Sequence, residues 1–106
     1  MNVHEITPRM LVDMMASDIP PVLVDVRTQI EASICQIDGS LLIPLDSLSQ
    51  HLGKMPADRP IVVYCHHGSR SLTAARYLAQ SGYEAVSLAG GIDRWAIEVA
   101  PEMARY

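Results

Sequence analysis

Short apolar runs that alternate with helical stretches restrict the fold of this chain more than any other feature. The runs are rich in β-branched residues and bounded by turn residues, so each is predicted to be a strand. They cover residues 3–6, 22–26, 40–43, 61–64 and 85–88. The runs at 22–26 and 61–64 are almost continuously apolar, which is typical of strands buried on both faces. The alternation predicts an α/β fold with a mostly parallel five-stranded sheet and helices on both faces.

The stretches between the runs carry helix start and stop signals. The predicted helices cover residues 9–16, 45–52, 71–80 and 92–97. Thr7 is a good N-cap, and Pro8 suits the first helical position of the first helix. Ser81 and Gly82 end the third helix. A chain of 106 residues can bury one hydrophobic core, so we expect a single domain over residues 1–106.

Composition and charge argue against several classes of function. The formal net charge is −4 and the eight Lys and Arg residues are spread thinly, so we expect neither a nucleic-acid partner nor a membrane partner. No apolar run approaches the roughly 18 residues of a membrane span, and the first residues lack a signal-peptide pattern. The two cysteines, Cys35 and Cys65, do not form a disulfide framework, which favours a reducing, cytoplasmic location.

The loops that follow two of the predicted strands are expected to form one site. In open α/β sheets, ligands bind outside the carboxyl ends of the strands. The loop after the run at 22–26 begins with Arg27, and the loop after the run at 61–64 begins with Cys65. Arg27 is expected either to recruit an anionic donor at this rim or to pair with Glu31. Asp25, inside an apolar strand, is expected to accept backbone hydrogen bonds or to pair with an arginine.

Cys65 stands directly before a predicted helix, where unpaired backbone N–H groups and the helix dipole stabilise an anion. These surroundings favour the thiolate, which is the reactive form of cysteine. Gly68 allows the turn to adopt backbone angles that let N–H groups converge above the sulfur. Arg70 adds a permanent cation. Ser69 or Ser71 is expected to cap the helix, and either hydroxyl is able to donate to a bound anion.

Two adjacent histidines, His66 and His67, occupy the same loop. Neighbouring loop residues rarely point at one ion, so no metal site is expected. Solvated side chains are the simpler interpretation.

The sequence resembles a known family at four ordered motifs. Residues 65–70, CHHGSR, match the CxxGxR active loop of the rhodanese-like sulfurtransferases, and residues 60–65, PIVVYC, resemble the strand that leads into it. Residues 23–27, LVDVR, resemble the early strand of that family, and residues 39–44, GSLLIP, its GAxxIP segment. Residues 88–95, LAGGIDRW, resemble its LxGGxxxW signature, in which Trp95 is expected to be a core residue.

The resemblance implies a rhodanese-like α/β domain in which Cys65 accepts sulfane sulfur and passes it on as a persulfide. The implied donor is a small anion such as thiosulfate, and the acceptor is cyanide, a thiol or a protein cysteine. Backbone groups of His66, His67, Gly68 and Ser69 would cradle the sulfur, and Arg70 would give electrostatic help. No metal or organic cofactor is needed.

One segment departs from the family pattern. Where the family has a Gly-His pair after a glutamate, this chain has Cys35 and Gln36 after Glu31. Cys35 is either a resolving thiol for Cys65 or a structural cysteine beside the sheet, and the sequence favours the second role.

Two rival functions fit part of the pattern. Cysteine phosphatases and arsenate reductases also place a cysteine and an arginine around an anion loop, but they resemble CxxxxxR. Here four residues separate Cys65 from Arg70, and Ser71 stands where the longer motif needs arginine. The second rival is a catalytically silent rhodanese-like module that binds or regulates a partner. Such modules typically lack the cysteine, whereas this chain keeps it.

Overall fold

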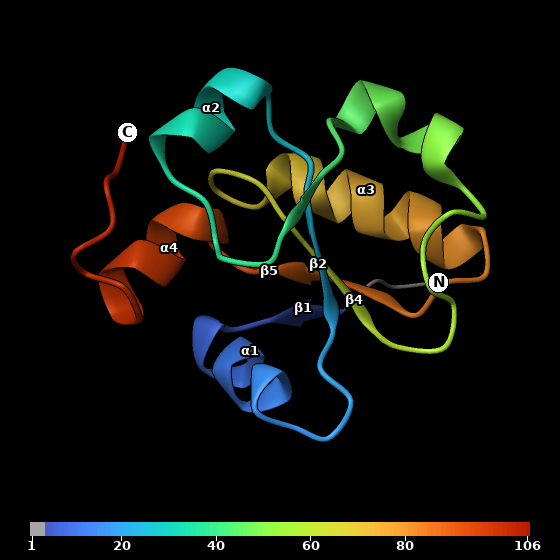
Figure 1. Cartoon of the computed structure of the whole chain (residues 1–106), viewed down its shortest axis with the longest axis horizontal. Helices are drawn as coiled ribbons and strands as arrows, with labels where there is room; N and C mark the ends of the chain where they lie inside the picture. Colours follow the sequence, from blue (N-terminus) through green and yellow to red (C-terminus); the bar gives the residue numbers. More distant parts are fainter. Residues whose placement is uncertain (1–3) are drawn as a thin grey trace.

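The computed structural model describes residues 4–106, and it contains one sheet of five strands (Figure 1). The strands are β1 (Glu5–Ile6), β2 (Val22–Asp25), β3 (Leu41–Leu42), β4 (Ile61–Tyr64) and β5 (Ala85–Leu88). They lie in the order β1-β5-β4-β2-β3, and every neighbouring pair is parallel. The predicted parallel α/β sheet is therefore confirmed. Val3, where the first predicted strand begins, lies outside the described residues.

Helices cover both faces of the sheet. They are α1 (Pro8–Met15), α2 (Gln29–Ile34), the 3-10 helix η1 (Leu45–His51), α3 (Ser69–Gln80) and α4 (Gly91–Glu98). α1 and α4 pack on one face, where Leu11 and Trp95 are buried against the sheet. α3 and η1 pack on the other face, where Leu48 and Leu78 are buried. The predicted core position of Trp95 is confirmed.

β4 is the central strand, and all four of its residues are buried. Side chains alternate along a strand, so Val62 and Tyr64 face α1 and α4, while Val63 faces α3. Cys65, the first residue after the strand, also faces α3. The polypeptide therefore delivers Cys65 to the edge of a closely packed core, at the carboxyl end of the sheet.

The first predicted helix has the cap that its sequence indicated. The Thr7 Oγ1 atom accepts a hydrogen bond from the Met10 N–H at 3.2 Å, and Pro8 is the first residue of α1. A proline is tolerated there because the first N–H groups of a helix have no partner inside it.

The short helix α2 was not predicted. It has six residues and buries none of them, so it leaves no apolar periodicity in the sequence. Its signal is the capping box formed by Thr28 and Glu31, in which each side chain accepts from the other residue's backbone N–H at 3.2 Å. This helix matters for function because it places Glu31 beside the loop that follows β4.

Within the part of the chain that the structure describes, no helix has the length and apolar character needed to span a bilayer.

Candidate active site

The active loop, defined here as residues 65–70, joins the end of β4 to the start of α3. α3 begins at Ser69, two residues before the predicted start, so Arg70 lies in its first turn. Gly68 is the N-cap and has φ of 112°, in the region that residues with a side chain rarely adopt. This conformation turns the chain sharply and leaves the first N–H groups of the helix facing back toward Cys65.

Those N–H groups converge on the Cys65 sulfur. The Gly68 N–H lies 3.1 Å from Sγ and the Ser71 N–H lies 3.3 Å from it. The thiol also faces the Ser71 hydroxyl, at 3.5 Å. Two backbone donors and the positive end of the α3 dipole therefore point at one buried sulfur atom, which is an arrangement that stabilises a negative charge there.

The two loop serines do not cap α3, so that expectation was wrong. The N-cap is glycine and has no side-chain cap hydrogen bond. Ser69 is exposed, whereas the buried Ser71 hydroxyl donates to the Gly68 carbonyl at 3.1 Å. The same hydroxyl lies 2.8 Å from the Ser87 Oγ atom in β5. Ser71 is thus turned inward toward the sulfur and the sheet because a glycine already shapes the start of the helix.

The start of α4 holds the other side of the active loop. The Ile92 N–H donates to the Cys65 carbonyl at 2.9 Å, and the Asp93 N–H donates to the His66 carbonyl at 3.1 Å. Gly91 permits this approach, because a Cβ atom there would collide with the His66 carbonyl. Gly91 of the LxGGxxxW motif therefore lets the N-terminus of α4 lie against the loop, and Gly90 is the N-cap of that helix, with φ of 74°.

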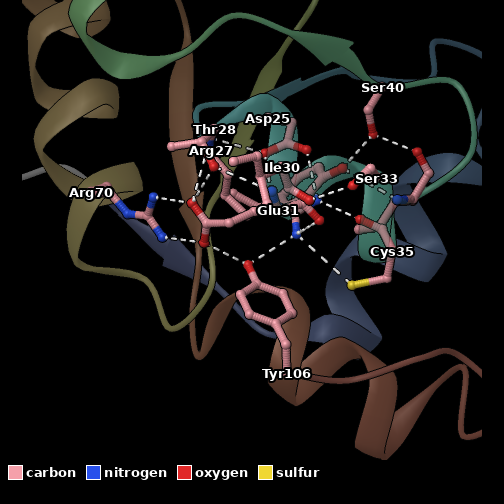
Figure 2. Close-up of polar contacts among 12 residues, drawn as sticks. Asp25, Arg27, Thr28, Ile30, Glu31, Ser33, Cys35, Ser40, Arg70 and Tyr106 are labelled. Carbon is pink, nitrogen blue, oxygen red and sulfur yellow. Dashed lines mark hydrogen bonds and ion pairs between the residues drawn. The ribbon is translucent and has the colours of Figure 1, made fainter.

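Arg70 is held by Glu31 of α2. Its guanidinium donates two hydrogen bonds to the Glu31 carboxylate, at 2.6 and 2.9 Å (Figure 2). This pair holds the pKa of Glu31 well below its ordinary value and raises that of Arg70. Arg70 thus remains a cation at the end of the loop, with a carboxylate beside it as counter-ion.

Arg27 does not occupy the position that the sequence suggested. Its side chain is fully buried and pairs with Asp25, with Nη2 2.7 Å from one carboxylate oxygen and Nε 2.9 Å from the other. The remaining N–H groups donate to the carbonyls of Glu31 and Cys35 and to the Tyr106 hydroxyl. Arg27 is therefore neither a rim cation nor the ionic partner of Glu31. A buried Asp25 carboxylate needs a matching charge, and the planar guanidinium supplies it.

Asp25 has the structural role expected of it, because it pairs with an arginine and also accepts from the Arg27 backbone N–H at 3.0 Å. Burial tends to lower the pKa of Arg27, but its hydrogen bonds to Asp25 and Tyr106 raise that pKa overall. The raised pKa keeps the Arg27 guanidinium charged at neutral pH.

Cys35 takes part in this buried network. Its carbonyl accepts from Arg27 Nη2 at 2.7 Å, and its sulfur lies 3.8 Å from Nη1 (Figure 2). Both cysteines are free thiols. These contacts agree with the structural role that the sequence favoured for Cys35.

Tyr106 is a site residue that the sequence gave no means to find. It lies 75 positions from Glu31, yet its hydroxyl donates to the Glu31 carboxylate at 2.7 Å and accepts from Arg27 at 3.0 Å. Burial is the main reason that its pKa rises to about 12. Its ring stacks on His66 with the centroids 3.8 Å apart, and His66 stacks in turn on His67 at 3.9 Å.

His66, His67 and Asp93 bring three possible ligand atoms within 4.8 Å of one another. The two imidazole rings are stacked at 27°, however, and nearly parallel rings do not direct their lone pairs at one ion. Asp93 is also engaged by the Arg105 guanidinium, at 2.9 and 3.3 Å. The arrangement does not favour a metal site.

Comparison with known proteins gives consistent matches. The rhodanese-like domain model matches residues 7–98. The chain is 42% identical over 104 residues to a probable adenylyltransferase/sulfurtransferase MoeZ of Mycobacterium tuberculosis, covering 95% of this chain and 26% of that protein. It is 38% identical to a sulfurtransferase of Allochromatium vinosum, covering 94% of this chain and 98% of that one.

A comparison with solved structures gives the same family. A rhodanese-like domain protein from Staphylococcus aureus superposes with a TM-score of 0.82 at 30% identity, covering 88% of this chain and 91% of that one. This chain thus spans about a quarter of the MoeZ protein but nearly the full length of the Allochromatium sulfurtransferase. The family model, these relatives and the strand-to-helix cysteine loop all lead to one assignment: the chain belongs to the family of rhodanese-like domains.

Proposed function

We propose that this protein is a sulfurtransferase that moves sulfane sulfur from thiosulfate or a related donor to a thiophilic acceptor through a persulfide on Cys65. The observation that carries the proposal is the convergence of the Gly68 and Ser71 N–H groups on the Cys65 sulfur, at 3.1 and 3.3 Å. The relatives from Mycobacterium tuberculosis and Allochromatium vinosum are both named as sulfurtransferases, which supports the same class of reaction.

In the first half-reaction, the Cys65 thiolate attacks the outer sulfur of thiosulfate. A bond forms between the two sulfurs, and the S–S bond of thiosulfate breaks. Sulfite leaves with the electron pair. The product is a persulfide whose terminal sulfur carries the negative charge, and the N–H groups at the start of α3 are placed to stabilise it.

In the second half-reaction, a nucleophile such as cyanide or a thiolate attacks the outer sulfur. The bond between the two persulfide sulfurs breaks, and Cys65 is released as a thiolate. The two steps balance without an external oxidant or reductant. No metal or organic cofactor enters this scheme.

Arg70 is the cation best placed to help an anionic donor. It lines a cavity of about 280 Å³ that lies at the carboxyl ends of β2 and β3, with Thr28 and Asp46 among the other lining residues. Arg27 contributes differently from what its sequence position suggested. Its charge is paired with the Asp25 carboxylate. Arg27 therefore supports the site by holding the end of β2 and the end of α2 in place.

The four residues between Cys65 and Arg70 favour this chemistry over phosphate transfer. A phosphatase loop wraps a tetrahedral oxyanion with more backbone groups than this loop offers. The shorter cradle suits one sulfur atom, and Ser71, where a phosphatase would need its arginine, is turned inward toward Cys65.

The test is the intact mass of the purified protein after incubation with thiosulfate and then with cyanide. We expect a gain of one sulfur atom that cyanide removes and that Cys65→Ser never acquires. Cys35→Ser is the matched control and is expected to gain and lose the sulfur like the wild type. A protein whose Cys65 is readily alkylated but gains no sulfur from thiosulfate or an organic persulfide would overturn the proposal and favour the silent binding module.

A further inference from the structure

The Cys65 side chain is almost fully enclosed, with 1% of the residue exposed. A nucleophile in that position reaches its donor only if part of the enclosure moves or if the donor is small. The elements that surround the sulfur are anchored in the sheet and its helices. The part of the enclosure best suited to movement is therefore a segment that contacts the active loop from outside the sheet and its helices.

One segment meets this description, and we call it the cover: Arg105 and Tyr106, which follow α4. The Tyr106 ring lies on His66, the first loop residue after Cys65, with ring centroids 3.8 Å apart. The Tyr106 hydroxyl donates to Glu31 at 2.7 Å, and Glu31 holds Arg70 at the other end of the loop (Figure 2). Tyr106 therefore contacts the loop directly at His66 and is linked to Arg70 through Glu31.

Arg105 fastens the same segment to the start of α4. Its guanidinium donates to both oxygens of Asp93, at 2.9 and 3.3 Å. Asp93 in turn lies 3.7 Å from the His67 ring nitrogen, at the exposed side of the loop. Tyr106 thus contacts His66 directly, and Arg105 contacts Asp93, which lies beside His67.

The cover is attached by side chains and not by a strand or helix. Residues 104–106 are exposed and have no regular secondary structure, and just before them the Met103 N–H donates a backbone hydrogen bond to the Ala100 carbonyl. His66 lies between His67 and Tyr106, and its Nε2 atom is buried without a hydrogen-bond partner, which is unfavourable for the closed arrangement. The cover is therefore able to lift without disturbing the sheet.

We propose that Tyr106 is a specificity-determining residue: in its closed position it admits small inorganic donors to Cys65 and excludes bulky organic ones. This inference rests on the proposed role of Cys65 as the nucleophile. The aromatic stack and the charged hydrogen bonds together correspond to a bias of about tenfold toward the closed position. Removing Tyr106 is expected to relieve that bias for bulky reagents and to leave small ones nearly unaffected.

The experiment compares two thiol reagents with the same reactive sulfur, methyl methanethiosulfonate and benzyl methanethiosulfonate. The rate of modification is read by mass spectrometry on the peptide that contains Cys65, so that Cys35 does not contribute. We expect Tyr106→Ala to accelerate the benzyl reagent about tenfold relative to the methyl reagent. Tyr106→Phe keeps the aromatic stack and loses the hydroxyl. Its ratio of benzyl to methyl rates is therefore expected to fall between those of the wild type and Tyr106→Ala.

Tyr77→Ala is the matched control, since it removes a tyrosine of similar exposure on α3. Its ratio of benzyl to methyl rates is expected to equal that of the wild type. An unchanged ratio in Tyr106→Ala, or an equal acceleration of both reagents, would overturn the proposal. Labelling does not require sulfur transfer, so this result stands apart from the persulfide test: a selective cover with no persulfide would refute only the proposed function.

Discussion

Arg70 is oriented by a single acidic residue, and the strength of that contact depends on pH. Glu31 accepts both guanidinium hydrogen bonds, which hold its pKa below the ordinary value in the folded state. A carboxylate with a depressed folded pKa adds stability above its ordinary pKa, about 4.3, and loses that stability as the pH falls below it.

Glu31→Gln is therefore expected to lower the free energy of unfolding by about 1 kcal/mol at pH 7, a small value because Arg70 is one-third exposed. Glutamine still completes the capping box of α2, so the helix start is retained. The difference from wild type should shrink as the pH falls below about 4. Urea unfolding at pH 7 and pH 3 measures it, and a difference that is the same at both pH values would contradict the ionic role.

Gly68 alone shapes the turn that directs backbone N–H groups at the Cys65 sulfur. Its φ of 112° makes Gly68→Ala costly by about 1–2 kcal/mol, although the added Cβ meets its nearest atom at an ordinary 3.4 Å. Relaxation of that strain moves the Gly68 N–H away from the sulfur, so sulfur transfer and alkylation of Cys65 are expected to slow. Gly82→Ala is the matched control.

At Gly82 the φ value is 98° and a Cβ atom would meet nothing within 4 Å. Gly82→Ala should therefore cost a similar amount of stability and leave the reactivity of Cys65 unchanged. Equal loss of reactivity in both variants would mean that Gly68 acts only through overall stability.

Among the helices, α4 holds the active loop directly, because the N–H groups of Ile92 and Asp93 in its first turn donate to the carbonyls of Cys65 and His66. Gly91→Ala places a methyl group against the His66 carbonyl, which is backbone and is not able to turn aside. We expect a loss of at least 2 kcal/mol in stability together with loss of sulfur transfer. Gly39→Ala is the control, since φ is 85° and the space around it is open. A Gly91→Ala protein with wild-type turnover would contradict the role of this contact.

The helices and strands that bury apolar residues were the ones that the sequence predicted. β4, buried at every residue, and β5 were predicted with their observed bounds. α2 buries nothing, and so the apolar spacing that predicts helices elsewhere is missing there. Its capping box was present at Thr28 and Glu31, but two polar residues are a weak signal on their own.

In the candidate site, too, some contacts could be predicted from the sequence and others could not. The contacts of Cys65 and Gly68 are local, and the spacing CxxGxR was enough to predict that N–H groups converge on the sulfur. The Arg27 side chain is held by Asp25 and by the carbonyls of Glu31 and Cys35, and also by the Tyr106 hydroxyl, 79 residues away. No local pattern tells whether an arginine after a strand points out to solvent or in to a buried aspartate. This is why the sequence left two roles open for Arg27, a rim cation or a partner of Glu31, and named neither as the pair with Asp25 that the structure shows.

For the molecule as a whole, Tyr64 joins the central strand to the segment that leads into β3. Its hydroxyl accepts from the Ile37 N–H at 3.2 Å and lies 2.8 Å from the Ser40 Oγ atom. Its side chain belongs to the core cluster beneath α1 and α4. Burial is the main reason that the pKa of Tyr64 rises to about 12.

A raised folded pKa means that the neutral phenol favours folding. Its contribution is complete below the unfolded pKa of about 10 and is lost as the pH rises toward 12. We therefore expect the free energy of unfolding to fall by about 2–3 kcal/mol between pH 9 and pH 12 on account of Tyr64. Tyr64→Phe should be less stable at pH 7, because the buried Ile37 N–H loses its acceptor, and yet should lose less stability on going to pH 12. Urea unfolding across this range tests both statements, and an alkaline decline as steep in Tyr64→Phe as in wild type would show that the phenol is not its source.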